Sequence, residues 1–196
     1  DVLRMLGVKY YLVDAEEKLP QGYSWSYYNN INHFKMFKLE EYRPIGFTYS
    51  NFKTNLDIEY GEENKVIKHD LKWNDELLVD ESLFNLISDI EPSDSINFEL
   101  IEFYNDNNLY GHIVNDTKQV LFFSIPYNEG WRLTDNDMPL TKYKVQGGFI
   151  GVILEPGDHY ISLRFAPVGL KQGAITSLAG FVLLLGLLIH DFKKKK

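Results

Sequence analysis

A chain of 196 residues without cysteine has room for one domain or two small ones, and it holds neither a disulfide nor a thiolate site. Of its 28 acidic and 20 basic residues, all but Asp191 and five lysines lie within residues 1–170, so that part carries a net charge of −12. This balance argues against nucleic-acid binding and against adhesion to an anionic bilayer by charge alone. Aromatic residues make up 15% of the chain, which favours a β-rich domain with faces for flat ligands such as sugars.

The first part of the chain predicts short strands separated by polar loops. Residues 1–6 are typical of the end of a helix, and Gly7 would stop it. The aromatic segment 23–28 precedes Asn29-Asn30, which we expect to form a turn. Strands are expected where apolar residues alternate with polar ones or form a β run, at 8–13, 33–39 and 44–52.

One amphipathic helix is predicted at about residues 74–90, and a break near Asp80 is left open. Asn74 or Asp75 would cap its start, and Pro92 would mark its end. The apolar residues on helical spacing are Leu77, Leu78, Phe84, Ile87 and Ile90.

From residue 95 onward the pattern predicts strands with turn residues between them. The expected strands are 96–104, 109–114, 118–126, 130–134, 140–145, 149–154 and 159–165. Turns are expected at 105–108, 135–139 and 155–158, where Asn, Asp, Pro and Gly gather. Short strands at close, regular spacing are typical of an antiparallel sandwich. We therefore expect a mainly β (α+β) protein with an antiparallel β-sandwich-like domain, one amphipathic helix and a C-terminal transmembrane helix.

The C-terminal segment predicts the membrane helix and its orientation. Residues 173–189 carry no charge, and four lysines occupy 193–196. A hydrocarbon core of about 30 Å needs roughly 20 apolar residues in a helix, with about 17 as the lower limit. A buried core helix is the alternative, but such a helix normally shows one polar stripe, and this segment is apolar all round. Because basic residues are retained on the inner side, we expect residues 1–169 to be extracytoplasmic and the lysine tail to be cytoplasmic.

Five short motifs resemble a known family. They are Leu-Gly-Val-Lys-Tyr-Tyr at 6–11, Ser-Ile-Pro-Tyr-Asn-Glu-Gly-Trp at 124–131, Gly-Gly-Phe-Ile-Gly at 147–151, Pro-Gly-Asp-His at 156–159 and Phe-Ala-Pro-Val-Gly-Leu at 165–170. In this order, ahead of a terminal span, they resemble the C-terminal part of the YfhO family of bacterial multi-spanning membrane proteins.

The resemblance implies a polytopic protein similar to C-type membrane glycosyltransferases. Members of the family are associated with sugar decoration of lipoteichoic acid or a related cell-wall polymer, from a polyprenyl-phosphate-linked donor. In such enzymes the catalytic acidic residue is expected on an extracytoplasmic loop near the first spans, upstream of this chain. The resemblance therefore places no catalytic residue, cofactor or metal in these 196 residues, and this part alone is expected to be inactive.

The expected organisation has four parts. Residues 1–92 form the N-terminal part of the extracytoplasmic region, 93–169 an antiparallel β domain, 170–192 the transmembrane helix and 193–196 the cytoplasmic tail. The expected partners are the lipid bilayer of a bacterial cell membrane, the upstream transmembrane bundle of the same protein, and a lipid-linked sugar or cell-wall polymer. No nucleic acid is expected.

Aromatic side chains are the candidates for ligand contact, because the apolar C–H faces of a pyranose pack on aromatic rings. The candidate carbohydrate contacts are Trp25, Tyr27, Tyr28, Tyr127 and Trp131. Structural burial is the competing interpretation, above all for Trp131. The Asp-x-Asp pattern at 135–137 could hold a metal, but its place in a predicted hairpin favours a turn.

Two functions from different classes remain open. In the first, this region aids acceptor binding or shapes the active site of a glycosyltransferase-like protein. In the second, it is a non-catalytic carbohydrate- or partner-binding β-sandwich anchored to the membrane. A purely structural cap over the membrane bundle is a third interpretation. The short connection at 167–169 favours the first, because it would hold the β domain close to the membrane surface, where a lipid-linked sugar is presented.

Overall fold

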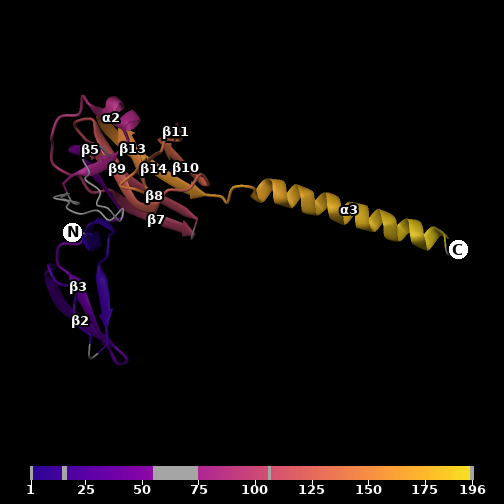
Figure 1. Cartoon of the computed structure of the whole chain (residues 1–196), viewed down its shortest axis with the longest axis horizontal. Helices are drawn as coiled ribbons and strands as arrows, with labels where there is room; N and C mark the ends of the chain where they lie inside the picture. The colour runs from indigo at the N-terminus through magenta and orange to yellow at the C-terminus, as the bar shows by residue number, and fades with distance from the viewer. Residues whose placement is uncertain (1, 15–16, 55–74, 106, 195–196) are drawn as a thin grey trace, which may run out of the picture.

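A computed structural model describes residues 2–14, 17–54, 75–105 and 107–194 (Figure 1). Two β sheets form the main body, and a small N-terminal sheet lies beside it. A long C-terminal helix projects away from the body on its own. The prediction of a mainly antiparallel β domain followed by an apolar helix is confirmed.

The main body is an antiparallel sandwich. Its five-stranded sheet has the order β11-β10-β14-β8-β7, and its four-stranded sheet has the order β12-β13-β9-β4. The bounds of the five-stranded sheet are β7 Glu99–Asn105, β8 Asn108–Asn115, β10 Trp131–Asp135, β11 Met138–Leu140 and β14 Gly157–Phe165. Those of the four-stranded sheet are β4 Gly46–Tyr49, β9 Gln119–Pro126, β12 Tyr143–Val145 and β13 Phe149–Leu154.

Strand β9 explains why the four-stranded sheet is covered on both faces. Side chains alternate across a strand, so an apolar run without polar interruption needs a core on each side. Leu121 and Phe123 pack toward the five-stranded sheet, in a core shared with Ile161 and Leu163. Val120 and Phe122 belong to a second core on the opposite face.

The second core packs under a short helix and a parallel strand pair. Helix α2, Glu81–Ile87, contributes Leu83 and Ile87. Strands β5, Phe52–Thr54, and β6, Leu77–Val79, pair in parallel. The body therefore has three layers, with the four-stranded sheet in the middle.

The helix predicted at about 74–90 is shorter than expected. Leu77–Val79 forms strand β6, and α2 begins only after Asp80, whose side chain accepts a hydrogen bond from the amide of Leu83 at 2.7 Å. Of the apolar residues on helical spacing, Leu77, Ile87 and Ile90 are buried in this second core, whereas Phe84 is exposed. Residues 77–79 form a strand because they pair with β5, which lies far away in the sequence, and local periodicity does not reveal this pairing. Residue 74 lies outside the described residues.

The N-terminal segment holds helix α1, Val2–Met5, and a three-stranded sheet of order β1-β3-β2. Its strands are β1 Tyr10–Val13, β2 Trp25–Ile31 and β3 Phe34–Leu39. Gly7, at a φ of +70°, follows α1 as predicted. The turn expected at Asn29-Asn30 is wrong, because β2 continues through both residues. The chain turns after Ile31, with Asn32 at a φ of +56°.

Helix α3, Leu170–Lys194, is joined to the body through a short connection that is itself hydrogen-bonded. The amide of Ala166 donates to the carbonyl of Gly130 at 3.0 Å, and the amide of Leu170 donates to that of Pro167 at 3.2 Å. By length and composition the segment Leu170–Leu187 could cross a membrane, and none of it is buried in the structure. The strand β14 thus leads into the helix without a long linker.

Candidate ligand-binding face

The outer face of the five-stranded sheet carries the polar side chains of strands whose other side chains fill the core. Along β14, Ile161 and Leu163 are buried, and the alternate residues Tyr160, Ser162 and Arg164 point outward. The antiparallel register aligns these residues with outward residues of β8 and β10. The two aligned rows are Arg132–Arg164–Asn108 and Thr134–Ser162–Tyr110.

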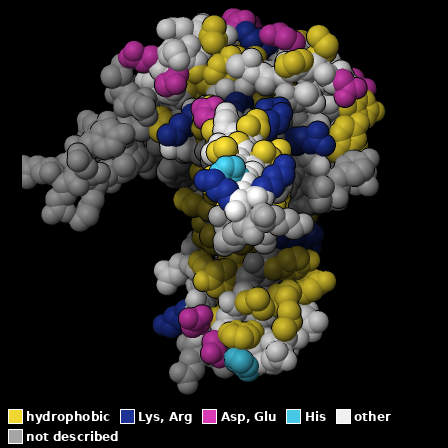
Figure 2. All heavy atoms as spheres, turned by 90° about the vertical axis from the view of Figure 1, so that its right-hand side faces the viewer, with side chains coloured by type: hydrophobic (Ala, Val, Ile, Leu, Met, Phe, Trp, Pro, Cys, Tyr) yellow, Lys and Arg dark blue, Asp and Glu magenta, His cyan; other side chains and the backbone are white. Residues whose placement is uncertain are grey.

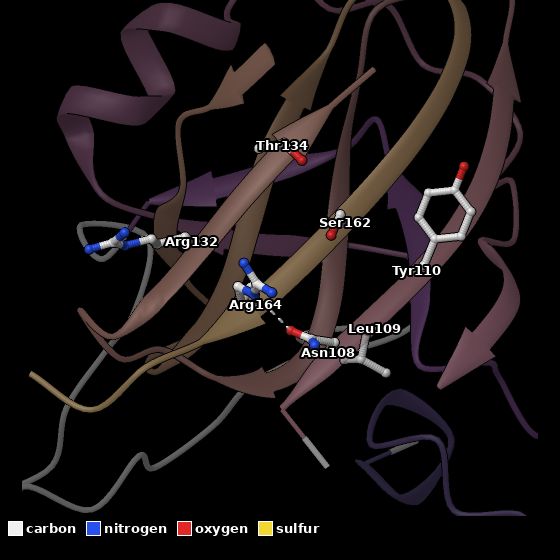
Figure 3. Close-up of a pocket in the computed structure, with 7 residues that line it drawn as sticks. All are labelled: Asn108, Leu109, Tyr110, Arg132, Thr134, Ser162 and Arg164. Carbon is white, nitrogen blue, oxygen red and sulfur yellow. Dashed lines mark hydrogen bonds between the residues drawn. The ribbon is translucent and has the colours of Figure 1, made fainter. Parts of the chain in front are cut away.

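These two rows line an open hollow of about 570 Å³ (Figure 3). The residues around it are Asn108, Leu109, Tyr110, Arg132, Thr134, Ser162 and Arg164. A second hollow, of about 250 Å³, shares Tyr110, Thr134 and Ser162 and extends to the β10–β11 turn. Together they make a continuous surface across β8, β14 and β10. We refer to it as the outer face.

Aromatic rings lie at one end of the outer face. The rings of Tyr110 and Tyr160 are nearly parallel, at 20°, with centroids 6.3 Å apart. The ring of His112 lies 4.6 Å from that of Tyr160, and its Nε2 is 2.6 Å from the carboxylate of Asp158. Flat rings of this kind can stack on a ligand, and the neighbouring hydroxyl and amide groups can form hydrogen bonds with it.

Two arginines lie at the other end, where β14 leads toward α3. Arg132 and Arg164 are directly paired across β10 and β14. The Nε of Arg164 donates to the Asn108 side chain at 3.3 Å, and in Figure 3 Arg132 extends toward the sheet edge. Within the described residues neither guanidinium forms an ion pair. Like charges directly opposite each other destabilise a sheet, and guanidinium groups can bind anions through paired N–H donors.

The aromatic residues singled out from the sequence lie in two separate places. Trp25 and Tyr27 are on one face of the small N-terminal sheet, where Trp25 packs against Tyr11 at 5.6 Å and donates from its indole nitrogen to the carbonyl of Pro20. Tyr28 lies on the opposite face, 5.0 Å from Tyr10. Tyr27 and Tyr28 are 58% and 56% exposed, so both are available to a ligand.

Tyr127 and Trp131 flank the turn between β9 and β10. The Tyr127 hydroxyl donates to the carboxylate of Glu129 at 3.1 Å, and Lys142 Nζ lies 5.3 Å from its ring centroid. Partial burial, and then the Glu129 carboxylate, raise the pKa of Tyr127. Trp131 packs against the sandwich core and against the ring of Phe165 at 5.0 Å. The structure thus gives Trp131 a packing role.

The Asp-x-Asp pattern is a turn, as the sequence predicts. Asn136 and Asp137 have φ values of +47° and +66° and join β10 to β11, with Asp135 paired with Met138. The Asp135 carboxylate lies 2.6 Å from Nδ1 of the buried His159. Among the described residues no cluster of three or more His, Cys, Asp or Glu side chains is suited to hold a metal ion.

The sequence alone does not predict the outer face, although the alternation of polar and apolar residues along one of its strands is visible there. Tyr160, Ser162 and Arg164 alternate with apolar residues, which predicts that they share one exposed face of a strand. The neighbours of that strand depend on the sheet order, in which β14 lies between β10 and β8. The two arginines are 32 positions apart in the sequence, and only the strand register brings them together.

The fold defines the class of protein, a β-sandwich domain joined to a helix long and apolar enough to cross a membrane. Residues 97–177 match the family model for bacterial membrane protein YfhO. The protein YfhO of Bacillus subtilis (strain 168), described as uncharacterized, is 35% identical over 72 residues, which cover 37% of this chain and 8% of that protein. No solved structure matches. Residues 97–177 thus form a YfhO-family region, and this similarity together with the apolar helix supports a membrane location.

Proposed function

We propose that residues 1–169 form an extracytoplasmic domain of a glycosyltransferase-like membrane protein. In this proposal the whole protein transfers a sugar from a polyprenyl-phosphate donor to lipoteichoic acid or a related cell-wall polymer. The domain described here binds the polymer acceptor or shapes the space in which it reacts. The lysines at 193–196 support the orientation, because basic residues are retained on the cytoplasmic side of a span.

The main support for the proposal is the open outer face with its aromatic end. Tyr110 and Tyr160 present nearly parallel rings beside the hydroxyl groups of Thr134 and Ser162 and the amide of Asn108. A sugar ring could stack on the tyrosines while its hydroxyl groups bond to the neighbouring polar side chains. The hollow is open, which suits a long polymer that must pass across the face.

A second candidate function rests on the small N-terminal sheet. Its exposed Tyr27 and Tyr28, with Trp25 on the same strand, would serve a non-catalytic carbohydrate- or partner-binding module. Tyr127 remains a candidate contact on the main body. The tyrosines of the small sheet are distant in sequence from the outer face. Substitutions in one place or the other can therefore distinguish the two functions.

The test is binding of purified lipoteichoic acid to the full chain in an uncharged detergent. Tyr110→Ala and Tyr160→Ala should each weaken binding about two- to tenfold, because an aromatic contact contributes about 0.5–1.5 kcal/mol beyond its buried area. Tyr42→Ala removes an exposed tyrosine from another part of the chain and should leave binding unchanged.

The contrary results are equally specific. Loss of binding in Tyr27→Ala or Tyr28→Ala, with the outer-face variants unaffected, would move the site to the small sheet and favour the second function. An absence of polymer binding by the unmodified chain would contradict acceptor binding by this domain and carbohydrate binding by the small sheet.

A further inference from the structure

The position of Arg132 connects the outer face to the start of α3. Arg132 lines the larger hollow of the outer face, and it also lines a separate hollow of about 280 Å³ at the junction with the helix. The junction hollow is formed by residues 129–130, Arg132 and residues 166–172. One end of the sandwich therefore faces the point where the chain enters α3.

This junction is placed at the level of lipid headgroups when α3 crosses a membrane. The apolar window of the helix begins at Leu170, and Val168 and Leu170 are 74% and 61% exposed. Headgroups occupy a layer of roughly 6 Å on each side of a hydrocarbon core of about 30 Å. A side chain that shares a hollow with residues 170–172 lies in that layer.

The charges at this end are mostly positive, although residues 1–170 together carry a net charge of −12. Arg132, Arg164 and Lys171 have no ion-pair partner among the described residues, and Lys142 donates to the carbonyl of Trp131 at 2.7 Å. Glu129 is the opposing charge, and its carboxylate is already 3.6 Å from Lys142. Figure 2 looks toward the body along the direction in which α3 projects, and most of the Asp and Glu side chains in this view lie along the upper edge of the body.

We infer that Arg132 and Arg164, with Lys171, form a binding site for the phosphate of an anionic phospholipid headgroup at the domain–membrane junction. Guanidinium groups bind phosphate oxygens through paired N–H donors. The paired arginines, which repel each other in the isolated chain, would share the negative charge of a headgroup. The site would hold the acidic domain close to the membrane. It requires only that α3 cross the membrane, so it is independent of the proposed sugar transfer.

The experiment uses the full chain in an uncharged maltoside detergent, with phosphatidylglycerol and phosphatidylcholine added in equal amounts. Native mass spectrometry counts each bound lipid. The four lysines at 193–196 would also attract anionic lipid, so they are changed to glutamine in every variant. The unmodified junction should prefer phosphatidylglycerol. Arg132→Gln with Arg164→Gln should lower this preference about 25-fold, since each basic residue near an anionic surface contributes about 1 kcal/mol, or about fivefold.

The matched control is Lys18→Gln with Lys35→Gln, which removes the same charge from exposed positions in the N-terminal segment. It should keep the preference. Lys171→Gln, outside the sandwich, should lower the preference about fivefold, and it tests the site even when the double arginine variant does not fold.

Three results would overturn the inference. The first is equal binding of phosphatidylcholine and phosphatidylglycerol. The second is an unchanged preference for phosphatidylglycerol in both the double arginine variant and Lys171→Gln. In the third, glycerophosphoglycerol, which has the headgroup but no acyl chains, would compete as strongly as the intact lipid. That result would assign the arginines to a soluble phosphodiester and not to a membrane lipid.

Discussion

Gly130 lies where the segment that leaves the sandwich crosses the start of β10. A Cβ atom at this position would be 2.5 Å from the carbonyl oxygen of Ala166 and 2.7 Å from the ring of Phe165. The same glycine accepts the backbone hydrogen bond from Ala166. The absence of a side chain thus allows the backbone contact that ties the end of β14 to the body.

Gly130→Ala should lower the free energy of unfolding by about 1–3 kcal/mol, because the added methyl group meets backbone that cannot move without breaking this contact. Denaturant unfolding of the full chain in uncharged detergent, followed by circular dichroism, measures it. Gly148→Ala is the control, since nothing lies within 4 Å of its added Cβ. Equal stability of the two variants would mean that the exit segment is not held against β10.

At the scale of the element, Asp80 determines where β6 ends and α2 begins. Its carboxylate accepts hydrogen bonds from the Leu83 amide and the Ser82 hydroxyl, each at 2.7 Å. The bond from the Leu83 amide, and next that from Ser82, lower the pKa of Asp80. A carboxyl group whose pKa is lowered by folding stabilises the protein above its unfolded pKa, about 3.9 for Asp. That contribution is lost as the pH falls through the folded-state pKa.

Asp80→Ala should therefore cost about 1 kcal/mol of stability at pH 7, the usual value for a lost N-cap. The difference between the variant and the unmodified chain should shrink as the pH is lowered below 4. Thermal unfolding at a series of pH values measures this. Asp80→Asn keeps a capping oxygen without the charge, so its stability relative to Asp80→Ala should not vary with pH in this range. The unmodified chain could instead exceed Asp80→Ala in stability by the same amount at every pH from 7 to 3. That result would contradict the assignment of Asp80 as a charged N-cap.

How much of the fold could be predicted depends on whether a segment's neighbours are local. Strand β9 was predicted within one residue, because Val-Leu-Phe-Phe between polar residues is typical of a strand buried on both faces. The local pattern predicts a helix at Leu77–Val79, but these residues form a strand because they pair with β5, more than 20 residues earlier in the sequence. Strand pairing at that distance leaves no mark in local periodicity.

The candidate site was less predictable than the fold. Aromatic residues can be found by inspection, but the sequence does not show that Trp131 packs against Phe165 or that Trp25 and Tyr28 lie on opposite faces of the small sheet. The arginine pair and the tyrosine pair of the outer face each require the register of separate strands. The alternation of polar and apolar residues along β14 is visible in the sequence, but only the strand register identifies the residues that meet on the outer face.

In the whole molecule, a short connection with backbone hydrogen bonds joins the sandwich to the helix. Strand β14 carries three outward residues of the outer face and continues through a hydrogen-bonded connection into α3. A membrane that contains α3 would lie next to the arginine end of the face, with the tyrosine end farther away. A polymer bound on the outer face would then be held near the membrane surface, where lipid-linked donors reside.

The central claim is that the β domain lies outside the cell and the lysine tail inside. These 196 residues contain no cysteine, so each introduced cysteine is the single thiol within them. Met138→Cys, at a 70% exposed position in the β10–β11 hairpin, and Lys196→Cys, at the tail, are compared in the intact bacterium with a membrane-impermeant maleimide. If the β domain lies outside, Met138→Cys is labelled in intact cells and Lys196→Cys only after permeabilisation. Labelling in the reverse order would contradict it.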